Sequence, residues 1–353
     1  MPCSDLRMHA DNSDVEWLIL TSTFKKFYML FLFQVICTNI ILRVNRTITP
    51  FFYTVFSVIS LSLIIGYAAA AVFIFYPSLI KSLCYMMTIC ALFFIHHPLF
   101  NFIRVNIPMG DSESFLFDVG IAWLILKSLS FAIDRIDSKK TSCGMSIFTD
   151  IFCVLSYSLY LPVLFTGPII TYETFCNQML KTAQPLPLKE LIHRFLLLVR
   201  HILWYFVYEF LLHYIYSHAV QFYPDAVQNY DSFALCGLGY ALPKMFFLKY
   251  YIIYGVSKCI SKLEDIELPP PPKCISCVHL SSELWRHFDR GLYLWILKYL
   301  YLPAGGARVH DGGITPLGPL LLIMYCGCHV SISWKEHQQN SKPVIMYNKS
   351  THR

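Results

Sequence analysis

Uncharged apolar runs are the dominant pattern along the chain. The stretches without Asp, Glu, Lys or Arg are residues 47–80, 82–103, 151–172 and 312–334. A helix needs about 20 predominantly apolar residues to cross a bilayer, so each stretch can supply one membrane helix. The pattern predicts helices at residues 27–42, 51–76, 82–102, 115–134, 147–166, 192–216, 233–257 and 314–334. The predicted fold class is therefore all-α, a polytopic helical membrane protein that forms a single domain over residues 1–353.

Polar segments separate and flank these helices. Residues 1–24 are expected to be a polar N-terminal tail, with membrane insertion starting at the first apolar helix. Residues 258–283 combine charged positions with four consecutive prolines. Because proline fixes φ and lacks an N–H, this composition predicts a stiff, extended loop. Residues 335–353 form a second polar tail.

The composition agrees with a membrane protein. Hydrophobic residues make up 56% of the chain and charged residues only 14%, whereas a soluble domain carries about 25% charged residues. The net charge of +6 does not indicate nucleic acid, because the basic residues gather at helix ends, as interfacial anchors do. The 13 cysteines are scattered through the apolar segments, which is typical of buried thiols and not of a disulfide framework.

Several ionisable residues fall inside predicted membrane helices. They are Asp118, Arg194, Arg200, Glu209, Lys244 and Lys249. Charges are costly in a bilayer, so two interpretations stay open: pairing or snorkelling, and a polar cavity within the bundle. Glu209 is expected to pair with a neighbouring helix. The breaks at Pro162 and Gly167–Pro168 favour the cavity, since non-helical backbone at membrane depth must be buried in protein or line a cavity.

The segment 284–306, LWRHFDRGLYLWILKYLYLPAGG, places four ionisable residues in an apolar context. Arg286 lies three residues before Asp289, so the two side chains can share one helix face. One interpretation is a structural Asp–Arg pair at an interface. The other is an acid that orients or stabilises a catalytic base elsewhere in the bundle.

Histidine and cysteine positions supply further candidates. His329 lies in the last apolar run and is either a satisfied core residue or, with an unperturbed pKa of about 6.5, a general base. Cys274 and Cys277 form a C-x-x-C, with His279 close behind. A single such pair lacks the four ligands of a structural zinc site. A redox dithiol is also disfavoured, because the surroundings do not suggest a soluble thioredoxin-like domain.

The segment 284–306 resembles the signature of the membrane-bound O-acyltransferase family. The signature has a Trp-Arg-x-Phe-Asp core, an apolar helix and a Tyr-x-Pro-x-Gly-Gly end. Its matches here are Trp285, Arg286, Phe288, Asp289, Tyr301, Pro303, Gly305 and Gly306. Residues 160–175, around Gly167 and Pro168, resemble a second element of the family. The tetrapeptide KCIS at 273–276 resembles the Hedgehog acyltransferase branch, and the whole resemblance covers about residues 25–313.

This resemblance implies a function. The branch transfers palmitate from palmitoyl-CoA to the N-terminal cysteine amine of secreted Hedgehog-like or EGF-like proteins, as multi-pass proteins of the endoplasmic reticulum membrane. It implies Asp289 and, 40 residues later, His329 as catalytic residues. It implies that Trp285 and Arg286 bind the acyl-CoA, and that the thiolate of Cys274 binds the iron of haem b. Membrane lipid is a further expected partner, and nucleic acid is not.

The chain departs from the family pattern after about residue 312. Relatives carry Trp before the histidine and Gly after it, where this chain has Cys328 and Val330. The expected fold is therefore a bundle of the family type that lacks its last helices. The alternatives to an active palmitoyltransferase are a truncated, catalytically inactive form, a membrane protein that binds lipid or partners, and a Wnt-type serine O-acyltransferase.

Overall fold

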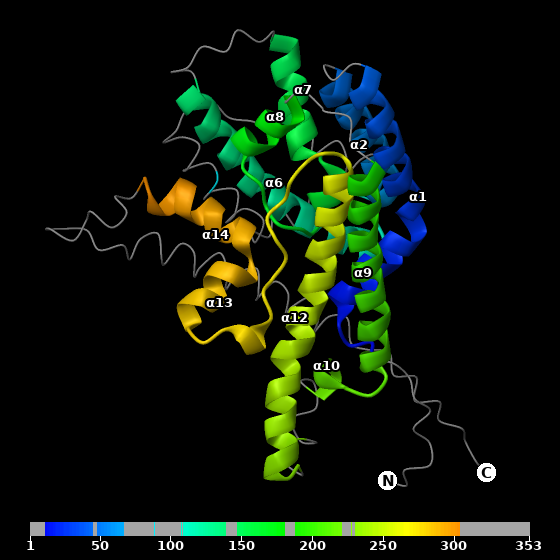
Figure 1. Ribbon diagram of the computed structural model, residues 1–353, viewed down its shortest axis with the longest axis vertical. Helices are drawn as coiled ribbons and strands as arrows, with labels where there is room; N and C mark the ends of the chain where they lie inside the picture. The colour runs from blue at the N-terminus through cyan, green and yellow to red at the C-terminus, as the bar shows by residue number, and fades with distance from the viewer. Residues whose placement is uncertain are drawn as a thin grey trace, which may run out of the picture.

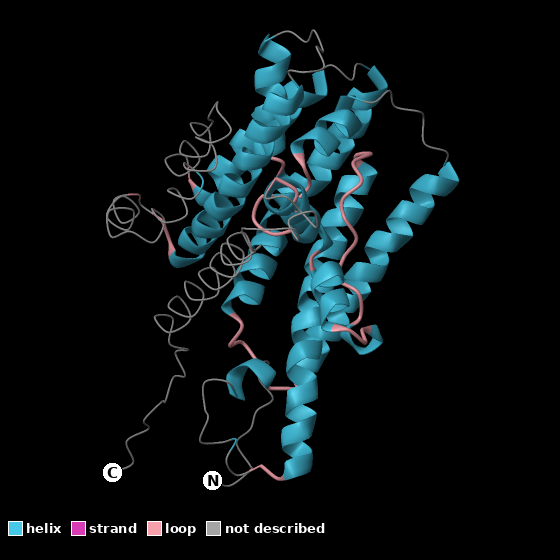
Figure 2. Cartoon of the chain, turned by 90° about the vertical axis from the view of Figure 1, so that its left-hand side faces the viewer, coloured by secondary structure: helices cyan, strands magenta, loops and turns pink. Residues whose placement is uncertain are grey.

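The chain folds into a bundle of helices. The computed structural model describes residues 11–44, 48–66, 109–138, 147–180, 188–220 and 230–303, with the single positions 88, 107 and 227. Every regular element in these ranges is a helix, and α9 (Leu188–Leu212) and α12 (Ser232–Leu263) run side by side (Figures 1 and 2). The all-α fold class is confirmed. The helices predicted at 82–102 and 314–334 lie outside the described residues, apart from residue 88.

Helix α1 spans Val15–Val44 and begins before the expected start at residue 27. Asp14 explains the early start, because its Oδ1 accepts a hydrogen bond from the backbone N–H of Trp17 at 3.2 Å and so caps the first turn. Residues 15–24, expected in a polar tail, are therefore helical. Residues 1–10 lie outside the described part of the chain.

Helix α2 spans Thr49–Ile65, whereas the apolar pattern extended it to residue 76. Gly66 follows it with a φ of 86°, in the left-handed region that glycine adopts without strain. This backbone conformation ends the helix at Ile65, although the sequence stays apolar beyond it, and residues 67–76 of the predicted helix lie outside the described part of the chain.

Residues 159–171 form a broken segment, in which the helix is interrupted, in the middle of the chain. The elements of this region are α6 (Asp111–Ser138), α7 (Ile147–Ser158), η3 (Leu161–Val163) and α8 (Tyr172–Leu180). The helix predicted at 147–166 is confirmed only as far as Ser158. Pro162 accounts for its early end, since proline lacks the N–H of the helix ladder and clashes with the preceding turn. A second break follows at Gly167–Pro168, where Gly167 has a φ of 146°. Helix α8 was not predicted. The broken segment is almost entirely buried, as irregular backbone at membrane depth must be.

The chain then runs through α9, the short α10 (Ser217–Val220) and α12, which continues through Pro243 to Leu263. Asp265, with a φ of 65°, turns the chain just after α12. The expected loop at 258–283 is therefore shorter: residues 258–263 are helical, and the extended prolines lead through η4 (Ile275–Cys277) to α13, which begins at Ser281.

The segment with the family signature forms two short helices with a break between them (Figure 1). Its elements are α13 (Ser281–Phe288), α14 (Arg290–Ile296) and a π-helical turn, η5 (Leu297–Tyr301). Trp295 and Tyr299 pack against Leu129, Ala132 and Ile133 of α6. This core holds the signature helix against a membrane-length helix.

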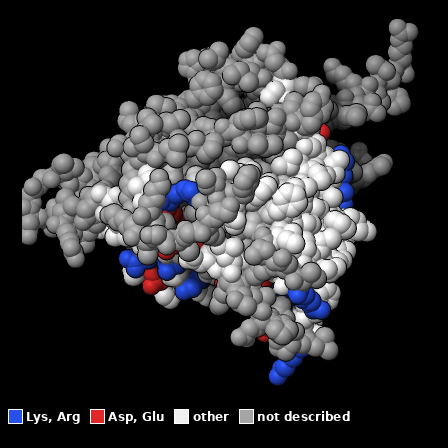
Figure 3. All heavy atoms as spheres, turned by 90° about the horizontal axis from the view of Figure 1, so that it is seen from above, with Lys and Arg blue, Asp and Glu red and all other residues white. Residues whose placement is uncertain are grey.

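The described helices include three that are long and apolar enough to cross a membrane. They are Val15–Arg43, Asp111–Ile136 and Lys189–Leu212. Helix α9 exposes large apolar side chains such as Phe206 and Phe210, which in a membrane protein contact lipid. Seen from above, much of the described surface lacks charge, and Lys, Arg, Asp and Glu gather in a few separate groups (Figure 3). The prediction of a helical membrane protein is confirmed.

Candidate functional site

Asp289 occupies the break between α13 and α14. Its backbone has a φ of −122° and a ψ of 88°, so it ends one helix and caps the next. Its Oδ1 accepts a hydrogen bond from the backbone N–H of Leu292 at 2.9 Å, as aspartate does at a helix N-cap. Its Oδ2 accepts a hydrogen bond from the hydroxyl of Tyr254 on α12 at 2.9 Å. Both carboxylate oxygens are therefore held from different directions.

Burial raises the pKa of the Asp289 carboxyl above its ordinary value, and the hydrogen bonds from Leu292 and Tyr254 lower it in part. Arg286 does not compensate this buried carboxylate. Its side chain is exposed on α13, and the described ion pairs do not include one between Arg286 and Asp289. The interpretation of Asp289 as half of a structural Asp–Arg pair is therefore wrong, because the break at Asp289 takes the two residues off a common helix face.

The two motifs of the family resemblance lie in direct contact. A Cβ added to Gly291 of α14 would lie 2.5 Å from the carbonyl oxygen of Ile169 and 2.8 Å from its backbone nitrogen. Only glycine permits this approach, because those atoms belong to backbone that cannot move aside. The segment after Gly167–Pro168 is thus packed against the first turn after Asp289.

A polar cluster holds the signature helix at its far end. Asp134 of α6 accepts a hydrogen bond from the Tyr299 hydroxyl at 2.7 Å and pairs with Lys298 at 2.8 Å. Lys298 also pairs with Glu173 of α8 at 2.9 Å. Ser130 donates to the Tyr299 oxygen at 2.8 Å. These contacts tie the π-helical turn to two other helices, which fixes the direction of α14.

Cys274 lies in the loop before α13. The Lys244 ammonium lies 3.3 Å from its Sγ, and the backbone N–H of Lys273 donates to the carbonyl of His287 at 3.3 Å. Burial opposes ionisation of the thiol, but a backbone hydrogen bond from Ser276 and the Lys244 charge outweigh it, so the pKa of Cys274 lies below its ordinary value. These contacts favour ionisation of this thiol relative to an ordinary cysteine. The searched part of the chain contains no group of three or more metal-binding side chains.

Two predicted site residues have side chains that the structure does not describe. Trp285 lies in α13, but its side chain is not among those described, and His329 lies in residues 304–353, outside the described ranges. The structure thus places Asp289, Arg286 and Cys274. It brings α13 next to the loop that carries Cys274.

Residues that sequence reasoning missed are Tyr254, Gly291 and the pair Asp134–Tyr299. Tyr254 lies 35 residues before Asp289, so chain spacing did not connect them. The available signal was that Tyr250 and Tyr254 are one turn apart and share a face of α12.

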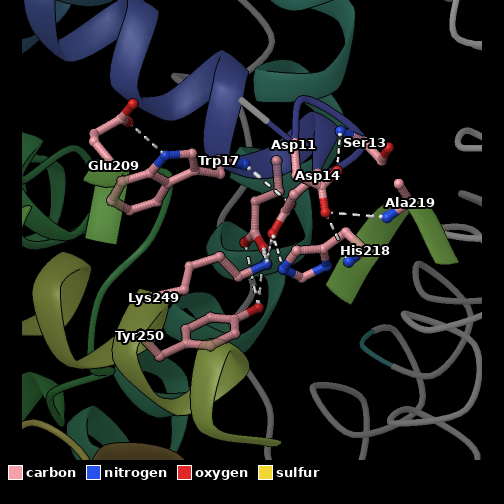
Figure 4. Close-up of polar contacts among 10 residues, drawn as sticks. Asp11, Ser13, Asp14, Trp17, Glu209, His218, Ala219, Lys249 and Tyr250 are labelled. Atoms are coloured by element: carbon pink, nitrogen blue, oxygen red, sulfur yellow. Dashed lines mark hydrogen bonds and ion pairs between the residues drawn. The ribbon is translucent and has the colours of Figure 1, made fainter. Parts of the chain in front are cut away.

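Pairing between helices accounts for several of the buried charges. Lys249 of α12 lies 2.9 Å from Asp14 and 2.7 Å from Glu16, at the start of α1, and Tyr250 donates to Glu16 (Figure 4). Glu209 accepts a hydrogen bond from the indole of Trp17 at 2.9 Å, which confirms a partner on a neighbouring helix. These contacts fasten the N-terminal end of α1 to α12.

A small polar cavity of about 210 Å³ lies at the end of α12, and Asp289 does not line it. Its lining includes Arg194, Lys262 and Asp265. Arg194 pairs with Glu190 at 3.0 Å and with Asp265 at 3.6 Å. The cavity is therefore lined by groups that are already paired with each other.

Comparison with known proteins adds a family assignment to this geometry. The profile of the MBOAT, membrane-bound O-acyltransferase family matches residues 114–315. The chain is 31% identical to the mouse protein-cysteine N-palmitoyltransferase HHAT over 44% of its own length and 31% of that protein. It is 27% identical to Drosophila melanogaster protein-cysteine N-palmitoyltransferase Rasp over 64% of its length and 44% of that protein. Schizosaccharomyces pombe membrane-bound O-acyltransferase gup1 is 29% identical over 51% of the chain and 30% of that protein. The chain thus spans less than half the length of these curated relatives.

Proposed function

Because this chain belongs to the membrane-bound O-acyltransferase family, we propose that it transfers palmitate from palmitoyl-CoA to the N-terminal cysteine amine of secreted signalling proteins. Two relatives that are named protein-cysteine N-palmitoyltransferases support this choice of donor and acceptor. The observation that carries it is Asp289, a partly buried carboxylate held at both oxygens inside the family signature. The expected setting is a multi-pass protein of the endoplasmic reticulum membrane, with Hedgehog-like or EGF-like acceptors.

The donor explains why such a reaction takes place inside a membrane protein. A palmitoyl chain has about 14 methylenes, and exposing them to water costs on the order of 11 kcal/mol at about 0.8 kcal/mol each. An apolar path between helices removes this cost. The lipid-facing helices described above supply the apolar surroundings, and membrane lipid is the natural second partner.

The proposed transfer needs little more than positioning and one base. The amine nitrogen attacks the thioester carbonyl carbon, an amide bond forms, the C–S bond breaks, and the proton lost by the amine ends on the CoA thiol. The α-amine has a pKa of about 8, so a base is needed only as it attacks. His329 is the proposed base, and Asp289 would orient it or stabilise its charged form.

The geometry of Asp289 suits that role. A carboxylate has about four lone-pair sites, and the described contacts of Asp289 include one at each oxygen. The remaining sites can accept an N–H from an imidazolium or an ammonium. Because the carboxylate is partly buried and not paired with a cation in the described contacts, it would interact strongly with a positive charge that develops nearby.

Arg286 is the proposed contact for the CoA phosphates. Its side chain is exposed and not used by Asp289, so the guanidinium is available for bidentate hydrogen bonds to phosphate oxygens. Trp285, its neighbour, is the proposed contact for the acyl chain near the thioester.

Cys274 is the proposed ligand of a haem b, and the surroundings of its thiol support this choice. Its thiolate is favoured by Lys244 and a backbone hydrogen bond, and a single thiolate is all that an axial haem ligand requires. When bound, the haem would supply an iron–sulfur bond that fastens the loop before α13. The proposed acyl transfer does not pass through the haem.

A second candidate is transfer to a hydroxyl acceptor. Relatives named membrane-bound O-acyltransferase match at 29% identity, close to the identity of the palmitoyltransferases. Both candidates use the same donor site and differ only in the acceptor atom.

The test is an assay of the purified full chain with labelled palmitoyl-CoA and three peptides. One begins with Cys, one begins with Ser, and one begins with N-acetylated Cys. Label that survives hydroxylamine on the first peptide alone supports amide formation at the terminal amine. Label on the second or third peptide that hydroxylamine or alkali removes supports an oxygen or sulfur acceptor. A chain that labels none of them is inactive or binds lipid without transferring it.

The site variant is Asp289→Asn, which keeps the shape of the side chain and a good helix cap. Asp231→Asn is the matched control, because Asp231 also caps a helix, accepting from Ala234 N–H at 3.0 Å, and is exposed. We expect Asp289→Asn to lower kcat by about 100-fold or more, because removing one electrostatic group from an active site has an effect of this size. Asp231→Asn should change kcat little. Equal activity of both variants would remove Asp289 from the reaction, and full activity of His329→Ala would remove the proposed base.

A further inference from the structure

Two tyrosines one turn apart on α12 each donate a phenol hydroxyl to a carboxylate, buried at Glu16 and partly buried at Asp289. Tyr254 donates to Oδ2 of Asp289 at 2.9 Å. Tyr250 donates to Glu16, with its oxygen 3.2 Å and 3.3 Å from the two carboxylate oxygens. The two rings contact each other edge to face, with centroids 5.6 Å apart. The same chemical contact is thus made twice, but only Tyr254 makes it with the residue of the family signature.

We propose that Tyr254 is a positioning residue for Asp289, which fixes the orientation of its carboxylate for acyl transfer. This inference rests on the proposed function. Tyr254 would not touch the reacting atoms of the acyl transfer. It acts through Asp289, and its side chain is only 5% exposed.

The carboxylate needs two points of attachment to have one orientation. The backbone N–H groups of Gly291 and Leu292 hold the carboxylate from its own segment, with Leu292 bound to Oδ1. The Tyr254 hydroxyl holds Oδ2, so the plane of the carboxylate is defined by both. Tyr254 is the side-chain donor to the carboxylate among the described contacts. Loss of the hydroxyl would remove one donor from a partly buried carboxylate, which favours rotation or protonation of Asp289.

The helix that carries Tyr254 is itself held in register. Lys249, five residues earlier, is fixed between Asp14 and Glu16 (Figure 4). On the other side, Gly255 lets His201 of α9 approach so closely that a Cβ at 255 would clash with the imidazole ring. Because α12 is fixed at both adjacent points, the phenol at 254 reaches Asp289 from a defined position.

The aromatic surroundings limit where Asp289 can move. Phe288 stacks on Phe246 of α12, with ring centroids 5.3 Å apart and an interplanar angle of 6°. It also meets Tyr250 with centroids 5.8 Å apart. The residue before Asp289 is therefore packed against α12. The hydrogen bond from Tyr254 then sets the final orientation of the carboxylate.

The titratable groups around Asp289 are few, so its protonation can be followed. Tyr250 and Tyr254 face it from α12. Arg286, His287 and Arg290 flank it along its own segment. Of these, only Tyr254 makes a described hydrogen bond to the Asp289 side chain.

Tyr254→Phe and Tyr250→Phe form a matched pair of variants. Each removes one hydroxyl from a buried phenol–carboxylate bond on the same helix and leaves the ring in place. We expect Tyr254→Phe to lower kcat on the order of tenfold, the effect of one hydrogen bond to a charged group. The KM for palmitoyl-CoA should stay within about twofold, because the donor is not touched. Tyr250→Phe should change kcat by less than about twofold.

The pH profile separates positioning from general damage. The phenol hydrogen bond favours the ionised form of Asp289, so its loss raises the pKa of that carboxyl. The acid limb of the kcat profile should therefore move to higher pH in Tyr254→Phe and stay in place in Tyr250→Phe. Equal effects of the two substitutions on kcat, or an unmoved acid limb in Tyr254→Phe, would overturn the proposal.

Infrared titration supplies a readout that does not need turnover. The carboxyl stretch of Asp289 is isolated by subtracting the spectrum of Asp289→Asn, and its midpoint is measured in both tyrosine variants. A midpoint shifted upward in Tyr254→Phe alone supports the contact, and an unshifted midpoint overturns it. If the wild type transfers no palmitate while the midpoint still shifts, the proposed function fails and Tyr254 remains only a structural partner of Asp289.

Discussion

The backbone of Ile169 lies directly against Gly291, where a Cβ would come within 2.5 Å of the Ile169 carbonyl oxygen. This contact joins the segment after the Gly167–Pro168 break to the first turn of the helix that Asp289 caps. Neither side can give way, because the opposing atoms are main chain on one side and a helix on the other. The position of α14, and with it Asp289, depends on the absence of a side chain at residue 291.

Gly291→Ala should therefore destabilise the protein. Overpacking of this kind costs about 1–3 kcal/mol, and here the neighbour is backbone, so the upper end of that range is expected. Thermal unfolding in detergent measures the effect. Gly237→Ala on α12 is the control, because a Cβ there meets nothing within 4 Å, and alanine in a helix should stabilise by about 0.5–1 kcal/mol. A neutral Gly291→Ala would show that the two segments are not packed this closely.

Lys249→Met should destabilise the protein strongly. The substitution leaves Asp14 and Glu16 buried without their cation, and breaking a buried pair in this way costs about 3–5 kcal/mol. Lys258→Met removes the more exposed pair with Glu267 and should cost less than about 1 kcal/mol. The comparison is made by the midpoint of thermal unfolding. The triple variant that adds Asp14→Asn and Glu16→Gln to Lys249→Met should recover much of the lost stability. A similar loss of stability in Lys249→Met and Lys258→Met would contradict the buried pairing of Lys249 with Asp14 and Glu16.

The folded state should lose stability as the pH rises from about 4.5 to about 7. Burial raises the pKa of Glu264, which follows the last residue of α12, from its ordinary value of 4.5 to about 7. Between these values the folded chain keeps a proton that the unfolded chain releases, so the free energy of unfolding falls with rising pH and levels off above about 7. Three donors, from Tyr160, Tyr53 and Gln34, all bind Oε2 of Glu264.

Denaturant unfolding at a series of pH values measures this dependence. Glu264→Gln cannot titrate, so it should flatten the slope over the same range, whereas the exposed Glu267→Gln should leave the slope unchanged. A slope that persists in Glu264→Gln would assign the pH dependence to another group.

Haem, if it binds as the resemblance implies, should depend on one cysteine. The purified chain is expected to show a Soret absorbance band that is lost in Cys274→Ala and kept in Cys277→Ala, because the thiolate is favoured at Cys274. Lys244→Met should weaken the band, since it removes the ammonium that lies 3.3 Å from Sγ. A band that persists in Cys274→Ala would place the haem elsewhere.

The apolar runs predicted the class of the protein and most of its helices. Some observed helix ends differ from the predicted ones, and these differences have physical causes in particular residues. Asp14 starts α1 early by capping it, and Gly66 ends α2 within a stretch that stays apolar. Pro162 and Gly167–Pro168 were recognised as breaks, but the pattern did not show that a separate helix, α8, follows them.

The sequence by itself determined that the chain is helical and lipid-facing, because uncharged runs of this length are stable only where backbone groups bond within the helix. It also determined the signature around Asp289, whose residues are contiguous. Only the tertiary structure decided that Tyr254 holds Asp289, that Arg286 does not, and that Lys249 joins α12 to the start of α1. Such contacts join residues far apart in the chain or depend on a break in the helix, and periodicity along one helix carries no information about which helix packs against it.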